Sequence, residues 1–236
     1  LEAAGEVMWE EVQATDFKAR APLLAAEAVE YRPAVIGLQE ATTWDCQNGL
    51  LGKKVSAYDF TRDFLRATEE AGEPYVVASA NGNEAFNPGY SIGPIPTMTT
   101  IDDPATFQPL FGSDTADCGF QLSDALLVRK DLADKVVNAG TTEFKDPHTI
   151  IPVVFTVERG FAWADLEFGG SPVRFVTTHL ESMWPTDGQN VGALQGQQIV
   201  EDLAGTQIPL VLMGDINNDP RDPRPLNAPN PAGQPT

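Results

Sequence analysis

Three short apolar runs in this sequence end in closely spaced polar residues. The first stops at Glu40, the second at His179 and Glu181, and the third at Asp215 and Asn217. Carboxylates are hard oxygen ligands that suit Mg²⁺, an imidazole can stabilise or protonate a phosphate oxygen, and an amide can donate hydrogen bonds to phosphate without adding charge. Together these side chains predict metal-assisted chemistry at a phosphoester.

Each of these residues also has a plainer interpretation when it stands alone. Glu40 and Asp215 can be solvated loop acids in an acidic chain, and a lone histidine such as His179 is more often structural than catalytic. The letters GDIN at 214–217 also read as a Gly-Asp turn. Their shared position favours function, because ligands and catalytic groups in layered α/β folds gather where strands end.

The elements that must position these residues follow from hydrophobic spacing and from capping signals. Apolar residues at helical spacing predict helices over 17–31, 59–71 and 191–203. Short apolar runs predict strands over 34–38, 75–79, 125–128, 151–156, 161–166, 173–178 and 209–213. Residues 81–120 show no sustained hydrophobic periodicity, which predicts a long surface loop, here called the excursion. The pattern predicts a mixed α/β fold, and several connections are too short for a doubly wound parallel sheet.

Composition bounds the size, solubility and partners of the protein. With 236 residues and 42% hydrophobic residues, the chain predicts one domain over 1–236 around a single core. The formal charge of −19 repels polyanions at long range, which disfavours unassisted wrapping of nucleic acid. No apolar run is long enough for a transmembrane segment, and we expect a monomer. Residues 218–236 are rich in proline and read as a loop or a disordered tail.

The two cysteines and the second histidine indicate where the protein is located and whether it can hold a structural zinc ion. Cys46 and Cys118 lie in polar, glycine-rich surroundings, where they can form one disulfide or remain two free thiols. A disulfide, the acidity and the few lysines favour an extracellular, secreted protein. We expect His148, in the sequence Asp-Pro-His-Thr, to be exposed. Two histidines and two separated cysteines make a structural zinc site a poor interpretation.

Taken together, the motifs IGLQE at 36–40, TTHLE at 177–181 and LMGDIN at 212–217 resemble the endonuclease/exonuclease/phosphatase (DNase I-like) superfamily. The resemblance covers residues 17–220. It implies a four-layer α/β sandwich of two packed mixed sheets flanked by helices. It also implies an Mg²⁺-dependent phosphoesterase (a phosphodiesterase, nuclease or phosphatase), with Mn²⁺ or Ca²⁺ as alternative ions.

The resemblance also assigns roles to individual residues. Glu40 would bind the metal, and Asp215 would orient or activate the attacking water close to it. His179 would contact the scissile phosphate, and Asn217 would bind phosphate or position Asp215. Glu181 is a supporting residue, and Asp124, ahead of the strand over 125–128, is a candidate for steadying His179.

Two features of the superfamily are not visible between residues 1 and 236. Its members begin with a strand that ends in Asn and finish with an Asp-His pair that handles protons. We therefore expect the natural protein to extend at both ends; the alternative is a catalytically dead relative that acts as a binding module. The phosphoester itself stays open between a small ester, a phospholipid headgroup and nucleic acid.

Overall fold

The computed structural model describes residues 2–47, 53–89, 91–98, 116–151, 155–182 and 190–218, and the chain forms two compact units. Unit 1 comprises Leu1–Ala34, Glu40–Val76 and Ser91–Ser123, and unit 2 comprises Val35–Gln39, Val77–Tyr90 and Asp124–Thr236. No helix among the described residues is long and apolar enough to cross a membrane. One domain over 1–236 stays a prediction, and the tail from residue 219 onward lies outside the described residues.

Unit 1 combines three helices with an antiparallel sheet. The helices are α1 (Glu2–Thr15), α2 (Phe17–Tyr31) and α3 (Phe60–Glu70). The sheet has the order β3-β2-β9-β8, with bounds Val55–Asp59, Thr43–Gln47, Ala116–Gln121 and Ser91–Met98. A further short strand, β4 (Tyr75–Val77), follows α3. The helices predicted over 17–31 and 59–71 are confirmed, with Asp16 and Asp59 as their N-caps.

A disulfide between Cys46 of β2 and Cys118 of β9 closes the centre of this sheet. The two cysteines are directly opposite one another in the strand register, and both are fully buried. Trp44, two residues before Cys46, packs against the rings of Trp9 and Phe120. The predicted disulfide is thus confirmed, and the alternative of two free thiols is wrong.

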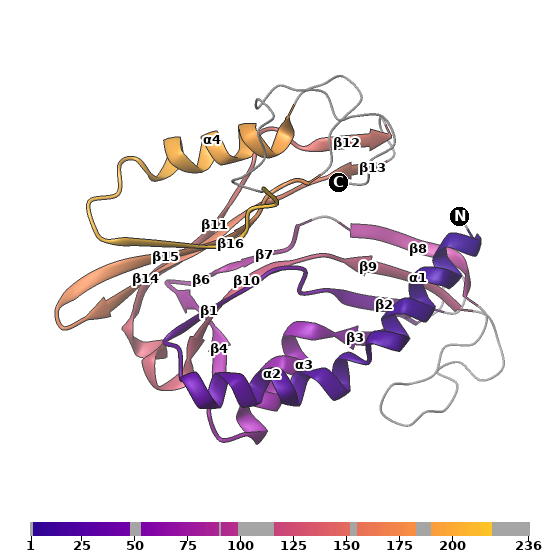
Figure 1. The fold of residues 1–236 in the computed structure, drawn as a ribbon, viewed down its shortest axis with the longest axis horizontal. Helices are drawn as coiled ribbons and strands as arrows, with labels where there is room; N and C mark the ends of the chain where they lie inside the picture. Colours follow the sequence, from indigo (N-terminus) through magenta and orange to yellow (C-terminus); the bar gives the residue numbers. More distant parts are fainter. Residues whose placement is uncertain are drawn as a thin grey trace. The chain divides into compact units, whose positions relative to one another are not determined.

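Unit 2 contains two sheets (Figure 1). In the first, β1 (Val35–Leu38) and β7 (Phe86–Asn87) both pair antiparallel with β10 (Asp124–Arg129). The second has the order β11-β14-β15-β16, with bounds Val136–Glu143, Gly160–Phe168, Ser171–His179 and Leu210–Asp215. The remaining elements are the hairpins β5 (Ser79–Ala80) with β6 (Asn83–Glu84) and β12 (His148–Ile151) with β13 (Phe155–Val157), the 3-10 helix η1 (Lys130–Lys135), and α4 (Val191–Leu203).

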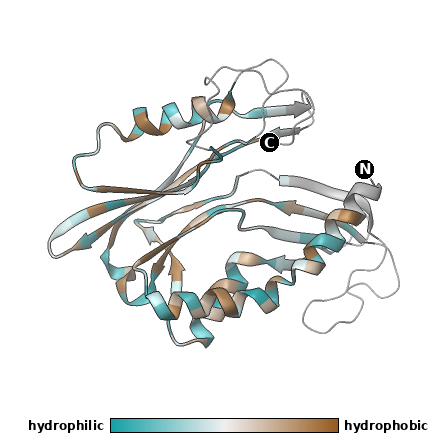
Figure 2. Ribbon diagram, in the orientation of Figure 1, coloured by the Kyte–Doolittle hydropathy of each residue, from teal (hydrophilic) through white to brown (hydrophobic). Residues whose placement is uncertain are grey.

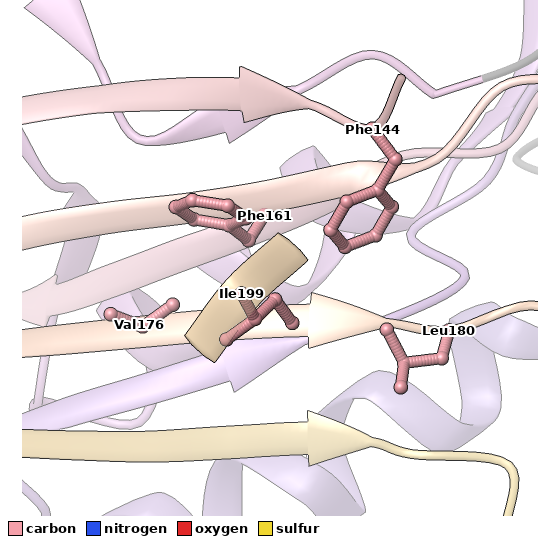
Figure 3. Close-up of a cluster of buried hydrophobic side chains, with 5 residues drawn as sticks. All are labelled: Phe144, Phe161, Val176, Leu180 and Ile199. Carbon is pink, nitrogen blue, oxygen red and sulfur yellow. The ribbon is translucent and has the colours of Figure 1, made fainter. Parts of the chain in front are cut away.

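The two sheets of unit 2 pack on each other, with β1 and β10 against β14 and β15. The helix α4 covers the second sheet, where Ile199 joins Phe144, Phe161, Val176 and Leu180 in a buried cluster (Figure 3). Along its length α4 carries both hydrophobic and hydrophilic residues, as an outer helix must (Figure 2). The mixed α/β class with packed sheets and outer helices is confirmed, and the other predicted outer helices, α2 and α3, pack together in unit 1.

Two sequence-based predictions were wrong in part: the excursion over 81–120 and the single strand over 151–156. Within the predicted excursion over 81–120, β8 and β9 pair with each other, with register shifts between Ile92 and Ile95 and between Ile95 and Met98. Such shifts interrupt the alternation of side chains by which a strand is recognised. The strand predicted over 151–156 belongs to two antiparallel strands, since residue 151 ends β12 and residue 155 begins β13.

Candidate active site

The second and third motifs meet at one edge of the second sheet of unit 2. Strands β15 and β16 run parallel, and their register extends from Arg174 opposite Leu210 to His179 opposite Asp215. Parallel neighbours present their carboxyl ends at the same edge of a sheet, where catalytic groups of layered α/β folds collect. The pairing therefore brings His179 and Asp215 together although α4 separates them in the chain.

Gly214 allows this close pairing. Its φ is +139°, and a Cβ atom built on it would lie 2.0 Å from the backbone oxygen of Thr178. No larger residue fits without displacing the backbone of β15. The glycine of the third motif is therefore a requirement of the strand geometry just before Asp215.

Asn217 fixes the chain after β16. Its side-chain Nδ2 donates to the backbone oxygen of Leu180 at 2.7 Å, and its backbone N–H donates to Oδ1 of Asp215 at 2.9 Å. The backbone N–H of Leu180 in turn donates to the backbone oxygen of Asp215 at 3.0 Å. Asn217 has φ +49°, a left-handed conformation that Asn tolerates better than most residues. These bonds lock the turns after β15 and β16 to each other.

His179 is buried and electrically neutral at pH 7. Its pKa is lowered to about 4, first because burial penalises the charged imidazolium and second because Arg159 is positively charged; Asp215 and Glu181 oppose the shift. The imidazole Nε2 lies 4.0 Å from Oδ2 of Asp215, too far for a hydrogen bond. A neutral imidazole can donate or accept one hydrogen bond at the site without adding charge.

Glu181 belongs to a buried charged cluster next to His179. Its Oε2 accepts a hydrogen bond from Nε of Arg159 at 3.3 Å and lies 3.8 Å from Nδ1 of His148. His148 is only 7% exposed, so the prediction of an exposed histidine was wrong: the β12 strand that it begins carries it into the cluster. No sequence pattern pointed to Arg159; the available signal was its position two residues ahead of the strand predicted over 161–166.

The first motif reaches this part of unit 2 through β1. Gln39 donates from Nε2 to the hydroxyl oxygen of Thr177 at 2.7 Å, and a Cβ atom on Gly37 would lie 2.5 Å from the same oxygen. The strand that leads to Glu40 thus packs closely on β15. Glu40 itself belongs to unit 1, is exposed, and has φ +53°. Its role as a metal ligand stays a prediction.

Asp124 begins β10, opposite Asn87 in the register, and is buried. Its predicted role in steadying His179 stays a prediction. Asp215, in contrast, is open to solvent, with 55% of its side chain exposed. Within the described residues no three His, Cys, Asp or Glu side chains converge on one point. Mg²⁺ needs only one or two carboxylates and keeps several waters, so the open carboxylate of Asp215 fits that ion.

At the level of sequence, no family model and no curated protein matches the chain. Among solved structures, it resembles an endonuclease/exonuclease/phosphatase family protein from Leptotrichia buccalis, with TM-score 0.48, 15% identity and coverage of 89% of this chain and 62% of that one. It also resembles truncated TDP2 of Caenorhabditis elegans, with TM-score 0.45, 14% identity and coverage of 87% and 58%. A third is a Bacteroides thetaiotaomicron mannosyl-6-phosphatase, with TM-score 0.42, 16% identity and coverage of 88% and 60%.

The chain therefore spans less than two thirds of the length of each of these proteins. At such identities the likeness concerns the fold.

Proposed function

We propose that the chain carries most of the active site of a divalent-metal-dependent phosphoesterase that hydrolyses its substrate by attack of water. The observation that supports this best is that His179 lies opposite Asp215 at the paired ends of β15 and β16, with Asn217 bonded to Asp215 and to Leu180. This arrangement joins a buried neutral imidazole, an open carboxylate and an amide on rigid elements, which is what precise positioning of a phosphoryl group requires.

Each side chain has a role that follows from its surroundings. The Oδ1 atom of Asp215 is held by the N–H of Asn217, whereas Oδ2 is left to orient a water molecule. His179, neutral at pH 7, can hydrogen-bond a phosphoryl oxygen and take up charge as the transition state forms. Asn217 positions Asp215 and, through Leu180, the segment that follows His179.

Glu40 and Asp215 would hold the metal ion, with Mg²⁺ as the first choice and Mn²⁺ or Ca²⁺ as alternatives. When bound, it would offset the charge that develops on the transferring phosphoryl group. Both carboxylates are exposed, as ligands of a strongly hydrated ion should be.

For the substrate we propose a small or lipid-derived phosphoester, because the formal charge of −19 disfavours a polyanion unless metal ions intervene. The Cys46–Cys118 disulfide supports an extracellular location, since disulfides persist in oxidising compartments.

The test is hydrolysis by the full-length protein of bis- and mono-(4-nitrophenyl) phosphate, sphingomyelin and DNA. Each substrate is offered with Mg²⁺, with Mn²⁺ and with a chelator. We expect at least one to be cleaved only with metal, and we expect His179→Ala to lower that rate about 10²-fold or more. Metal binding without cleavage of any substrate would favour the binding-module alternative. If His179→Ala changed only thermal stability, His179 would be a structural residue.

A further inference from the structure

Arg159 is a buried cation with few hydrogen-bond partners. Its side chain is 9% exposed, and among the described residues its guanidinium bonds only to Glu181, through Nε at 3.3 Å. A guanidinium has five N–H donors in a planar fork. No Nη atom of Arg159 is among the buried side-chain atoms of the described residues that lack a partner, so its unused donors lie at the exposed 9% of the side chain, where an anion can reach them.

A second arginine on the same sheet shows what a completed pair looks like. Arg174 of β15 donates from Nε and Nη2 to the two carboxylate oxygens of Asp165, at 2.7 and 2.8 Å. It also lies over the ring of Trp163 at 4.4 Å. Asp165 thus accepts from both Nε and an Nη atom of Arg174, whereas the Nη atoms of Arg159 have no protein acceptor among the described residues.

Glu181 cannot turn to give Arg159 a second bond. Its side chain is fully buried, and its Oε1 accepts from the backbone N–H of Ser182 at 2.8 Å. Its own N–H donates to Gln195 at 2.8 Å, and its backbone oxygen is so close to Gly192 that a Cβ there would lie 2.6 Å away. The carboxylate is held in place and holds Arg159 by Nε alone.

Arg159 also lies at the catalytic edge of the sheet. It directly precedes β14, whose Phe161 is opposite Thr178, and the hydroxyl of Thr178 donates to the backbone oxygen of Gly160. The carboxylate that Arg159 contacts, Glu181, follows His179 by two residues. The unused donors therefore belong to the neighbourhood of His179 and not to the far end of the strand, where Arg174 is.

We propose that Arg159 is an anion-binding residue that contacts a phosphoryl oxygen of the substrate beside His179, and that Glu181 is the positioning residue that holds it. This inference rests on the proposed function for the identity of the anion. It adds a cation supplied by the chain itself, which would stabilise the negative charge of the phosphoryl group.

The test compares inhibition by inorganic phosphate, direct binding of inorganic phosphate and turnover of bis-(4-nitrophenyl) phosphate in variants of the full-length protein. Arg159→Met combined with Glu181→Gln removes both charges and keeps a side-chain oxygen that can accept from the N–H of Ser182, which the fold should tolerate. We expect about 10-fold weaker phosphate binding and about 10²-fold lower kcat/KM. Arg159→Lys keeps the charge but loses the fork, and should be intermediate.

Arg174→Met combined with Asp165→Asn is the matched control, because it removes an arginine and its buried carboxylate partner from the same sheet but away from His179. We expect it to keep wild-type turnover and phosphate affinity. The proposal is overturned if the double variant at Arg159 and Glu181 and the Arg159→Lys variant both keep wild-type phosphate affinity and kcat/KM. If the wild-type protein cleaves no phosphoester yet loses phosphate binding with Arg159, the proposed function fails and the anion site stands.

Discussion

Replacing Asn217 separates the contribution of its amide from that of its backbone conformation. The amide donates to Leu180 at 2.7 Å, and the residue has φ +49°. Asn217→Gly removes the amide but accepts the left-handed conformation, whereas Asn217→Ala removes the amide and also strains the backbone. The difference in stability between the two variants therefore measures the strain of alanine less the entropy cost of glycine.

The magnitudes follow from these two terms. Loss of a partly buried hydrogen bond costs about 1 kcal/mol, and glycine adds about 0.5 kcal/mol through the entropy of the unfolded chain. Alanine in the left-handed region adds about 1.5 kcal/mol instead. We therefore expect Asn217→Gly to lose about 1.5 kcal/mol and Asn217→Ala about 2.5 kcal/mol. In a chain of this size, the difference amounts to roughly 2–4 °C in Tm.

Thermal unfolding followed by circular dichroism measures the stability, and turnover of the best substrate measures the site. Both variants lack the amide that ties Leu180 to the turn after β16, so both should lose activity to a similar extent although their stabilities differ. Equal Tm values for the two variants would contradict the strain argument. Wild-type turnover in Asn217→Gly would show that the amide does not support the site.

Three further predictions concern the neighbouring residues. Gly214→Ala should destabilise the fold by about 3 kcal/mol or more, because its Cβ would meet the backbone oxygen of Thr178, and a thermal melt with unchanged Tm would contradict this. Glu40→Gln should abolish metal-dependent turnover and leave Tm nearly unchanged, since the side chain is exposed; equal activity at limiting and saturating Mg²⁺ would remove Glu40 from the site. Because the pKa of His179 is about 4 in the folded state and higher in the unfolded state, the unfolded state binds more protons between these values. Stability should therefore rise with pH across that window, by up to roughly 3 kcal/mol, and urea unfolding at pH 4.5 and 7 should show a smaller rise for His179→Gln.

Much of the fold could be predicted because its elements have regular hydrophobic spacing. The helix predicted over 191–203 is α4 to the residue, and the strand predicted over 173–178 is β15 extended at both ends. The ends of these buried strands also indicated where polar residues would gather. Once β15 and β16 are paired in parallel, the register alone places His179 opposite Asp215.

The strands β8 and β9 could not be predicted in the same way. The predicted excursion over 81–120 is rich in Gly, Pro, Asn and Asp, and the register of β8 shifts twice against β9. A strand with such shifts does not keep one set of side chains on one face, so its sequence lacks the period of two. What holds this pair in the sheet is tertiary, including the disulfide between Cys118 of β9 and β2.

The charged cluster behind His179 shows a second limit of sequence reasoning. Neither Arg159 nor His148 stands in a pattern that predicts burial, and residues of these types are usually exposed or only partly buried. Both are buried beside Glu181, which the TTHLE motif places two residues after His179, but only Arg159 is hydrogen-bonded to its carboxylate. Since a buried carboxylate requires a compensating cation, the buried Glu181 explains the buried Arg159. The position of Glu181 is set in turn by α4, through Gln195. The helix α4 therefore also helps to place the positive charge of Arg159 near His179. None of the three sequence motifs predicts this relation, because it joins residues of separate elements.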